Sequence, residues 1–95
     1  MLIRSQNKRE LVDITNTKIC IEESRGYSPA DYYIFACGAY QATLGKYTSE
    51  EKALNVLDMI EAEYNAPIYI NKIAYQYEKY DHEVFHMPED SEVIV

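Results

Sequence analysis

Short stretches of alternating apolar and polar residues fill the first half of the chain and predict strands. The clearest is 17–22, where Ile19 and Ile21 share one side and polar residues share the other. Further strands are expected over residues 2–5, 10–14, 32–37 and 39–44, with a loop over 24–31. The links between them are short, and parallel strands need long crossovers. The pattern therefore predicts antiparallel pairing.

The hydrophobic period changes from two residues to three or four after residue 48. The apolar positions that follow this helical spacing are Ala53, Val56, Leu57, Ile60 and Tyr64. Thr48 and Glu51 match a capping box, in which each side chain bonds the backbone amide of the other residue. Asn65, Ala66 and Pro67 are typical of a helix end. A main helix is predicted over residues 49–65.

The last third of the chain is less regular. Ile70, Ile73 and Tyr77 fit a second short helix over 68–81, whereas the apolar run 68–70 fits a strand, and we favour the helix. Residues 83–87 have the composition of a strand that ends before Pro88, and residues 89–95 are expected to form a tail.

These elements together predict an α+β fold. We expect a small antiparallel sheet of four to six short strands with one main amphipathic helix packed on it. A length of 95 residues, 47% of them hydrophobic, fits a single domain. Within 1–95, residues 1–47 are the sheet meander, 48–65 the main helix, and 66–95 a variable segment with a C-terminal strand or tail.

Charge narrows the choice of partners. The net charge is -7, and it is divided unevenly: residues 1–48 carry +1 and residues 49–95 carry -8. So acidic a chain is unsuited to direct nucleic-acid binding. No apolar run in the sequence is long enough to cross a membrane, and we expect no signal peptide. Cys20 and Cys37 lack zinc-site spacing and are expected to be buried structural thiols in a cytoplasmic protein.

Residues 82–86 match the zinc-peptidase pattern H-E-x-x-H. On a helix, His82 and His86 share one face and can bind a zinc ion, while Glu83 activates its water. The surrounding residues favour a strand, on which positions four apart are about 13 Å apart. Pro88 ends any helix, and the only candidates for a third ligand, Glu89 and Glu92, lie in the expected tail. We therefore expect no metal site, with His82 and His86 kept only as a weak alternative.

Tyrosine is unusually frequent, with ten residues in the chain. They are too many for a small core, and tyrosine is favoured in interfaces and ligand pockets. The cluster from Tyr69 to Tyr80 fits an oligomer interface as well as it fits a cover over the junction of helix and sheet. A homo-oligomer is accordingly expected.

Three segments resemble a group of small uncharacterised proteins of Gram-positive bacteria, their phages and mobile elements. They are residues 1–6, residues 44–53 with Val56, Leu57, Asp58 and Ile60 after them, and residues 85–90. The resemblance covers most of the chain outside about 66–82. It implies no catalytic residues, and it implies that 85–90 is a structural tail that does not need its histidine.

The hypothesis that follows is a non-enzymatic binding protein of phage or mobile-element type that counteracts host defence and uses no cofactor. In one mechanism it sequesters a small anionic nucleotide signal, with charge and stacking from Arg4, Arg25, Tyr33, Lys46 and Tyr47. In the other it masks a basic host protein that binds nucleic acid, through Glu50, Glu51, Asp58 and Glu61. The alternatives are a minimal zinc metallopeptidase built on His82, Glu83 and His86, or a self-associating structural protein.

Overall fold

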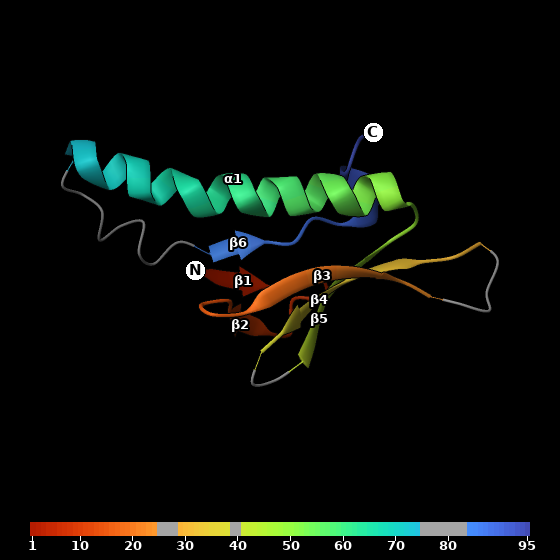
Figure 1. Ribbon diagram of the computed structural model, residues 1–95. Helices are drawn as coiled ribbons and strands as arrows, with labels where there is room; N and C mark the ends of the chain where they lie inside the picture. Colours follow the sequence, from red (N-terminus) through yellow and green to blue (C-terminus); the bar gives the residue numbers. More distant parts are fainter. Residues whose placement is uncertain (25–28, 39–40, 75–83) are drawn as a thin grey trace.

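The part of the chain that the structure describes folds into six short strands and one long helix, which confirms the α+β class (Figure 1). The computed structural model describes residues 1–24, 29–38, 41–74 and 84–95, with side chains omitted for 65–74. In chain order the elements are β1 (Leu2–Arg4), β2 (Leu11–Asp13), β3 (Lys18–Glu23), β4 (Tyr32–Cys37), β5 (Gln41–Tyr47), α1 (Glu50–Ala74), β6 (Val84–His86) and the 3-10 turn η1 (Asp90–Glu92).

The strands divide into two three-stranded sheets. The first has the order β2-β1-β6, in which β1 pairs antiparallel with β2 and parallel with β6. The central position, Ile3, lies between Val12 and Phe85 and is fully buried. The parallel pair joins the two ends of the chain, so no short connection limits its direction.

The second sheet is an antiparallel meander of order β3-β4-β5. Its inner face carries Ile34 and Ala36, both buried, with Ile19 and Ile21 packed beside them. The register of β5 skips Leu44, because Phe35 pairs with Thr43 while Ile34 pairs with Gly45. This bulge lets two consecutive residues, Leu44 and Gly45, both be buried.

Helix α1 lies across one side of the strands and contacts β4 and β5 (Figure 1). Its inner face consists of Ala53, Val56 and Ile60, all buried. The prediction that the helix ends at residue 65 was wrong, because α1 continues to Ala74 and takes in the first half of the segment assigned to a second helix. A proline removes one backbone hydrogen bond and strains one turn, but the bonds on either side can carry the helix past Pro67.

The C-terminal segment completes the core rather than forming a tail. β6 confirms the strand predicted at 83–87, but Met87 and Val93 are buried and η1 turns the chain between them. The last residues run back beside the start of α1, where Asn55 Nδ2 donates to the carbonyl of Ile94 at 3.2 Å. The polar composition of residues 89–92 suggested an exposed tail. In the structure, the carboxylates of Asp90 and Glu92 instead accept hydrogen bonds from neighbouring backbone amides.

Candidate functional site

The solvent side of α1 presents the four acidic residues selected from the sequence. Glu50, Glu51, Asp58 and Glu61 are all exposed. A helix turns about 100° per residue, which places these four carboxylates and Leu54 within an arc of about 100°. Leu54 lies inside that arc and is 47% exposed. We call these five residues the acidic face; it is the candidate site that the structure assembles most completely.

The N-terminal turn of α1 is capped one residue later than predicted. Ser49 Oγ accepts a bond from the Lys52 amide at 3.2 Å, and the Ser49 carbonyl accepts the first helical bond, from Ala53. The predicted capping box of Thr48 with Glu51 is therefore wrong. Thr48 is held elsewhere, since its amide and hydroxyl both donate to the Asp90 carboxylate at 2.8 and 3.1 Å. Glu51 is left free at the positive end of the helix dipole.

One flank of α1 is neutralised by the C-terminal segment. Lys52 Nζ lies 3.1 Å from Asp90 Oδ2 in the one salt bridge formed among the described side chains. Bonds from the Thr48 amide, together with Lys52, lower the pKa of Asp90. Within the described residues, the carboxylates of the acidic face have no such cation beside them. Their charge is available to a partner.

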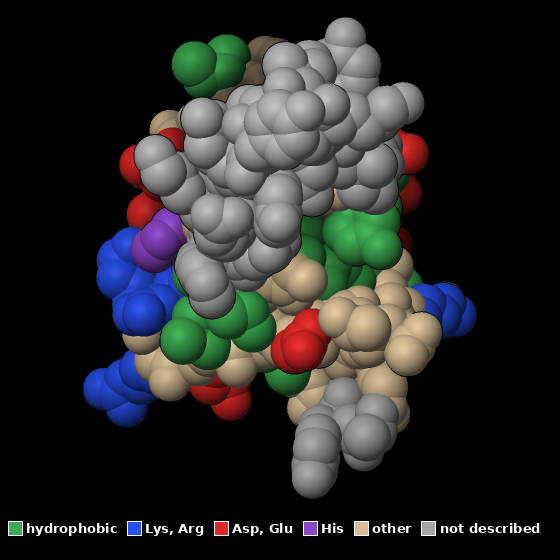
Figure 2. Space-filling view, turned by 90° about the vertical axis from the view of Figure 1, so that its left-hand side faces the viewer, with side chains coloured by type: hydrophobic (Ala, Val, Ile, Leu, Met, Phe, Trp, Pro, Cys, Tyr) green, Lys and Arg blue, Asp and Glu red, His purple; other side chains and the backbone are tan. Residues whose placement is uncertain are grey.

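Arg4 lies in a different sheet from the other predicted ligand residues that the structure describes. It sits on β1 beside His86 of β6, and Figure 2 shows the histidine next to a group of basic side chains. Arg4 Nη1 donates to the Lys8 carbonyl at 3.4 Å. Its neighbours are thus in the β2-β1-β6 sheet, whereas Tyr33 and Lys46 are in the other. The anion site as predicted from sequence does not assemble around Arg4.

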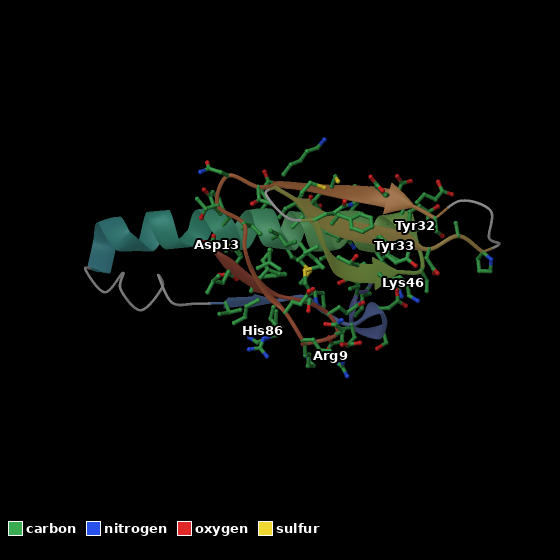
Figure 3. All side chains as sticks on the ribbon, turned by 90° about the horizontal axis from the view of Figure 1, so that it is seen from below. Arg9, Asp13, Tyr32, Tyr33, Lys46 and His86 are labelled. Carbon is green, nitrogen blue, oxygen red and sulfur yellow. The ribbon has the colours of Figure 1, made fainter. Side chains whose placement is uncertain are left out.

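Tyr33 and Lys46 are direct cross-strand partners on the outer face of the β3-β4-β5 sheet. Figure 3 shows both at one end of the molecule, away from Arg9 and His86. The Tyr33 ring stacks on Phe35 with centroids 5.9 Å apart and an angle of 21° between the rings. Glu22 pairs with Tyr33 from the other side. The pair is a small stacking surface with one cation.

Tyr47 cannot serve as a stacking residue, because it is fully buried. Its hydroxyl donates to the carbonyl of Pro88 at 2.7 Å, and burial raises its pKa. It faces inward because the bulge in β5 shifts the alternation by one residue. Arg25 lies outside the described residues. Of the five residues predicted to bind the anion, Tyr33 and Lys46 are therefore the two that the structure shows together.

The described part of the zinc-peptidase pattern lies on a strand. His86 is the exposed last residue of β6, while His82 and Glu83 lie outside the described residues. Among the residues that the structure describes, no three histidine, cysteine or acidic side chains gather closely enough to hold a metal ion. The tyrosine cluster from Tyr69 to Tyr80 also lies outside the described side chains.

The two thiols are neighbours, which the sequence did not indicate. Cys20 Sγ and Cys37 Sγ are 3.8 Å apart on β3 and β4. Both are half-buried on the outer sheet face, so the expectation of buried thiols was wrong. Desolvation, followed by the contact with Cys37, raises the pKa of Cys20 and keeps that thiol protonated.

Sequence reasoning also missed a groove beside β2, lined in part by Glu10, Asp13 and Gln41. The local signal was a turn in which Asp13 binds Thr15, but nothing in the sequence places Gln41 opposite them.

Comparison of the chain with known protein families, curated proteins and solved structures finds no match in any of the three. In the part of the chain that is described, no helix combines the length and the apolar character needed to cross a membrane.

Proposed function

We propose that the chain is a non-enzymatic binding protein that docks the acidic face of α1 on a basic surface of a partner protein. In the phage or mobile-element setting, the partner is a host protein that binds nucleic acid, and docking masks its basic surface. The observation that supports this most directly is the gathering of Glu50, Glu51, Asp58 and Glu61 in one exposed arc.

The acidic face has the two components that protein recognition uses. Its carboxylates speed encounter with a basic surface and select against acidic ones. Leu54 supplies exposed apolar surface among them, which is where binding energy concentrates once water is excluded. Scattered surface charges that serve only solubility need no such apolar centre.

The test compares two variants that remove equal charge. Glu51→Gln with Asp58→Asn alters the acidic face, and Glu22→Gln with Glu23→Gln alters exposed positions on β3. Binding is measured by biolayer interferometry against basic nucleic-acid-binding proteins of a Gram-positive host. We expect the first variant to bind about three- to thirtyfold more weakly and the second to bind nearly as the parent does.

The salt dependence of binding and a Leu54 variant complete the test. Raising the ionic strength should weaken binding by the parent more than by the first variant. Leu54→Ala should weaken binding while leaving the salt dependence unchanged, because it removes apolar contact only. Equal losses in both charge variants would show that net charge alone is at work, and would overturn the docking proposal.

A second candidate function is capture of an anionic nucleotide on the outer face of the β3-β4-β5 sheet. The pairing of Tyr33 with Lys46, and the stacking of Tyr33 on Phe35, favour it. Lys46→Met and Tyr33→Ala should each weaken binding of a cyclic dinucleotide in calorimetry, and Arg4→Met should not. A loss with Arg4→Met alone would move the site to the other sheet.

We extend the proposal to a cytoplasmic homo-oligomer without a cofactor. Native mass spectrometry of protein purified without chelator measures subunit number, metal and retained small molecules together. Stoichiometric zinc would instead favour the peptidase alternative at His82, Glu83 and His86.

A further inference from the structure

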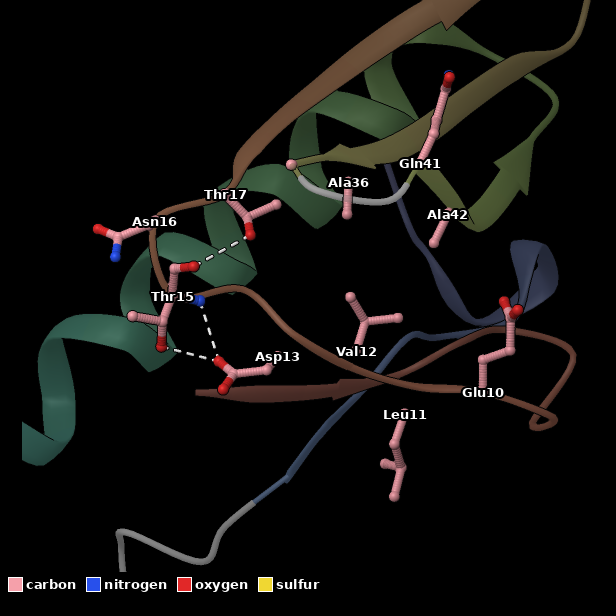
Figure 4. Close-up of a pocket in the computed structure, with 11 residues that line it drawn as sticks. Glu10, Leu11, Val12, Asp13, Thr15, Asn16, Thr17, Ala36, Gln41 and Ala42 are labelled. Atoms are coloured by element: carbon pink, nitrogen blue, oxygen red, sulfur yellow. Dashed lines mark hydrogen bonds between the residues drawn. The ribbon is translucent and has the colours of Figure 1, made fainter.

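A groove of about 780 Å³ runs between the two sheets. One wall is β2 with the residues on either side of it, and the other is formed by the end of β4 and the start of β5. Figure 4 shows Val12, Ala36 and Ala42 turned toward one another across it. The polar residues Glu10, Asp13, Thr15 and Thr17 also line the groove, and Gln41 lies at its edge with its side chain turned away.

The wall formed by β2 is a sheet edge with free backbone groups. The Ser5 amide donates to the Glu10 carbonyl, and the Ile14 amide donates to the Met1 carbonyl. The residues that bond to β1 are therefore Glu10 and every second residue after it. Antiparallel ladders alternate between bonded and unbonded pairs, and Leu11 and Asp13 occupy the unbonded ones. Their N–H and C=O groups therefore point away from β1, at the free edge of the sheet that borders the groove. The opposite wall includes β5, the edge strand of the other sheet.

The groove is negatively charged. Glu10 and Asp13 lie toward the two ends of β2, and none of its described lining residues is basic. Asp13 Oδ1 accepts bonds from the amide and hydroxyl of Thr15 at 3.0 and 2.8 Å, and these bonds lower the pKa of Asp13. The carboxylate is thus fixed and ionised, while its Oδ2 makes no hydrogen bond to the described residues.

We propose that this groove binds an extended, lysine- or arginine-rich segment of a partner protein as an added strand on β2. The backbone of the segment pairs with Leu11 and Asp13. Basic side chains on the two faces of the segment reach Glu10 and Asp13, which are three positions apart and therefore lie on opposite faces of the extended chain. A second copy of this chain is a poor occupant, because it brings a charge of -7 to an acidic groove. The inference goes beyond docking of the acidic face, since it uses a different surface and does not require α1.

The test uses a fluorescein-labelled peptide of about ten residues built from the repeat Lys-Lys-Val-Val, which places lysines on both faces of a strand and is long enough to cover β2. Binding is followed by fluorescence anisotropy, and the site by amide hydrogen exchange. We expect saturable binding and new protection at Leu11 and Asp13. The same peptide with glutamate in place of lysine should not bind. A version N-methylated at alternate residues should bind at least about tenfold more weakly, because it cannot pair as a strand.

Two conservative variants test the groove itself. Asp13→Asn keeps the oxygen that accepts from Thr15, and Glu10→Gln keeps the side-chain length; each should weaken the lysine peptide about two- to fivefold. Glu23→Gln, at an exposed position of β3 outside both the groove and the acidic face, is the matched control and should leave peptide binding unchanged, while Glu51→Gln reports separately on the acidic face. Circular dichroism verifies that every variant is folded.

Three results would overturn the inference. They are equal binding of the N-methylated peptide, unchanged binding in Asp13→Asn and Glu10→Gln, or protection confined to α1. Loss of binding in Glu51→Gln alone would place the peptide on the acidic face and support the proposed function instead. Protection of β2 that grows with protein concentration without peptide would assign the groove to a second copy of the chain.

Discussion

Tyr47 shows most clearly how single residues hold this fold together. Its ring is fully buried and its hydroxyl donates to the Pro88 carbonyl, so it joins β5 to the C-terminal segment. Pro88 also accepts from Gln6 Nε2 at 3.1 Å and keeps that partner if the tyrosine hydroxyl is removed. The adjacent Gly45 leaves room for the ring, since a methyl group there would lie 3.0 Å from Tyr47 Cε2.

Tyr47→Phe should lower the free energy of unfolding by about 1 kcal/mol, because one hydrogen bond is lost and its acceptor keeps another. Tyr47→Ala should cost about 3–5 kcal/mol, since it also leaves a cavity. Urea unfolding followed by circular dichroism measures both. Equal losses for the two variants would mean that the hydroxyl bond, and not the ring, dominates.

At the scale of elements, α1 depends on the short segment before it. Ser49 caps the helix, while Thr48 binds the Asp90 carboxylate next to η1. Ser49→Ala should lower the free energy of unfolding by about 1 kcal/mol, as is usual for a lost cap. Thr48→Ala should cost less, because the Thr48 amide still donates to Asp90. A larger loss for Thr48→Ala, measured by urea unfolding, would restore Thr48 as the cap.

The contact between η1 and α1 should also depend on pH. The pKa of Asp90 is lowered in the folded chain, mainly by the Thr48 amide and then by Lys52. Its stabilising contribution is therefore present above the pKa of an unfolded aspartate, about 3.9, and is lost as the pH falls through the lower folded value. Asp90→Asn should be less stable than the parent at neutral pH.

The difference between Asp90→Asn and the parent should shrink below about pH 4. Urea titrations across that range measure it. Asp13, whose pKa is lowered by Thr15, adds a loss of the same sign that both proteins share. A difference that stays constant down to low pH would show that the carboxylate charge of Asp90 does not stabilise the fold.

At the scale of the whole molecule, the two ends of the chain form one core. β6 lies parallel to β1, and Met87 and Val93 are buried in the same core cluster as residues of β1, the β3-β4-β5 sheet and α1. The molecule also has two separate acidic surfaces, which are the acidic face on the outside of α1 and the groove beside β2. Two acidic surfaces on different elements allow one basic partner to make two contacts, or two partners to bind at once.

The structural role of the C-terminal segment is open to a direct test. Met87→Ala should cost about 2–5 kcal/mol, because the side chain is buried and leaves a cavity. Ile94→Ala should change stability by less than about 0.5 kcal/mol, because Ile94 is 87% exposed. Urea unfolding compares them. A small loss for Met87→Ala would mean that the segment detaches readily, as a tail would.

Local patterns in the sequence were sufficient to predict the strands, the start of α1 and the fold class. The strands follow from two-residue alternation, and the start of α1 and its acidic face follow from helical spacing, because both depend only on near neighbours in the chain. The α+β class follows from those elements. The same patterns placed Glu50, Glu51 and Asp58 together without any knowledge of the fold.

Only the tertiary structure decided which distant segments meet. The parallel pairing of β1 with β6, the division into two sheets and the groove all join residues far apart in the chain. The separation of Arg4 from Lys46 and the burial of Tyr47 depend on those pairings and on one bulge. Hydrophobic burial drives such contacts and is non-directional. The local spacing of apolar residues therefore does not show which distant element packs against each apolar face.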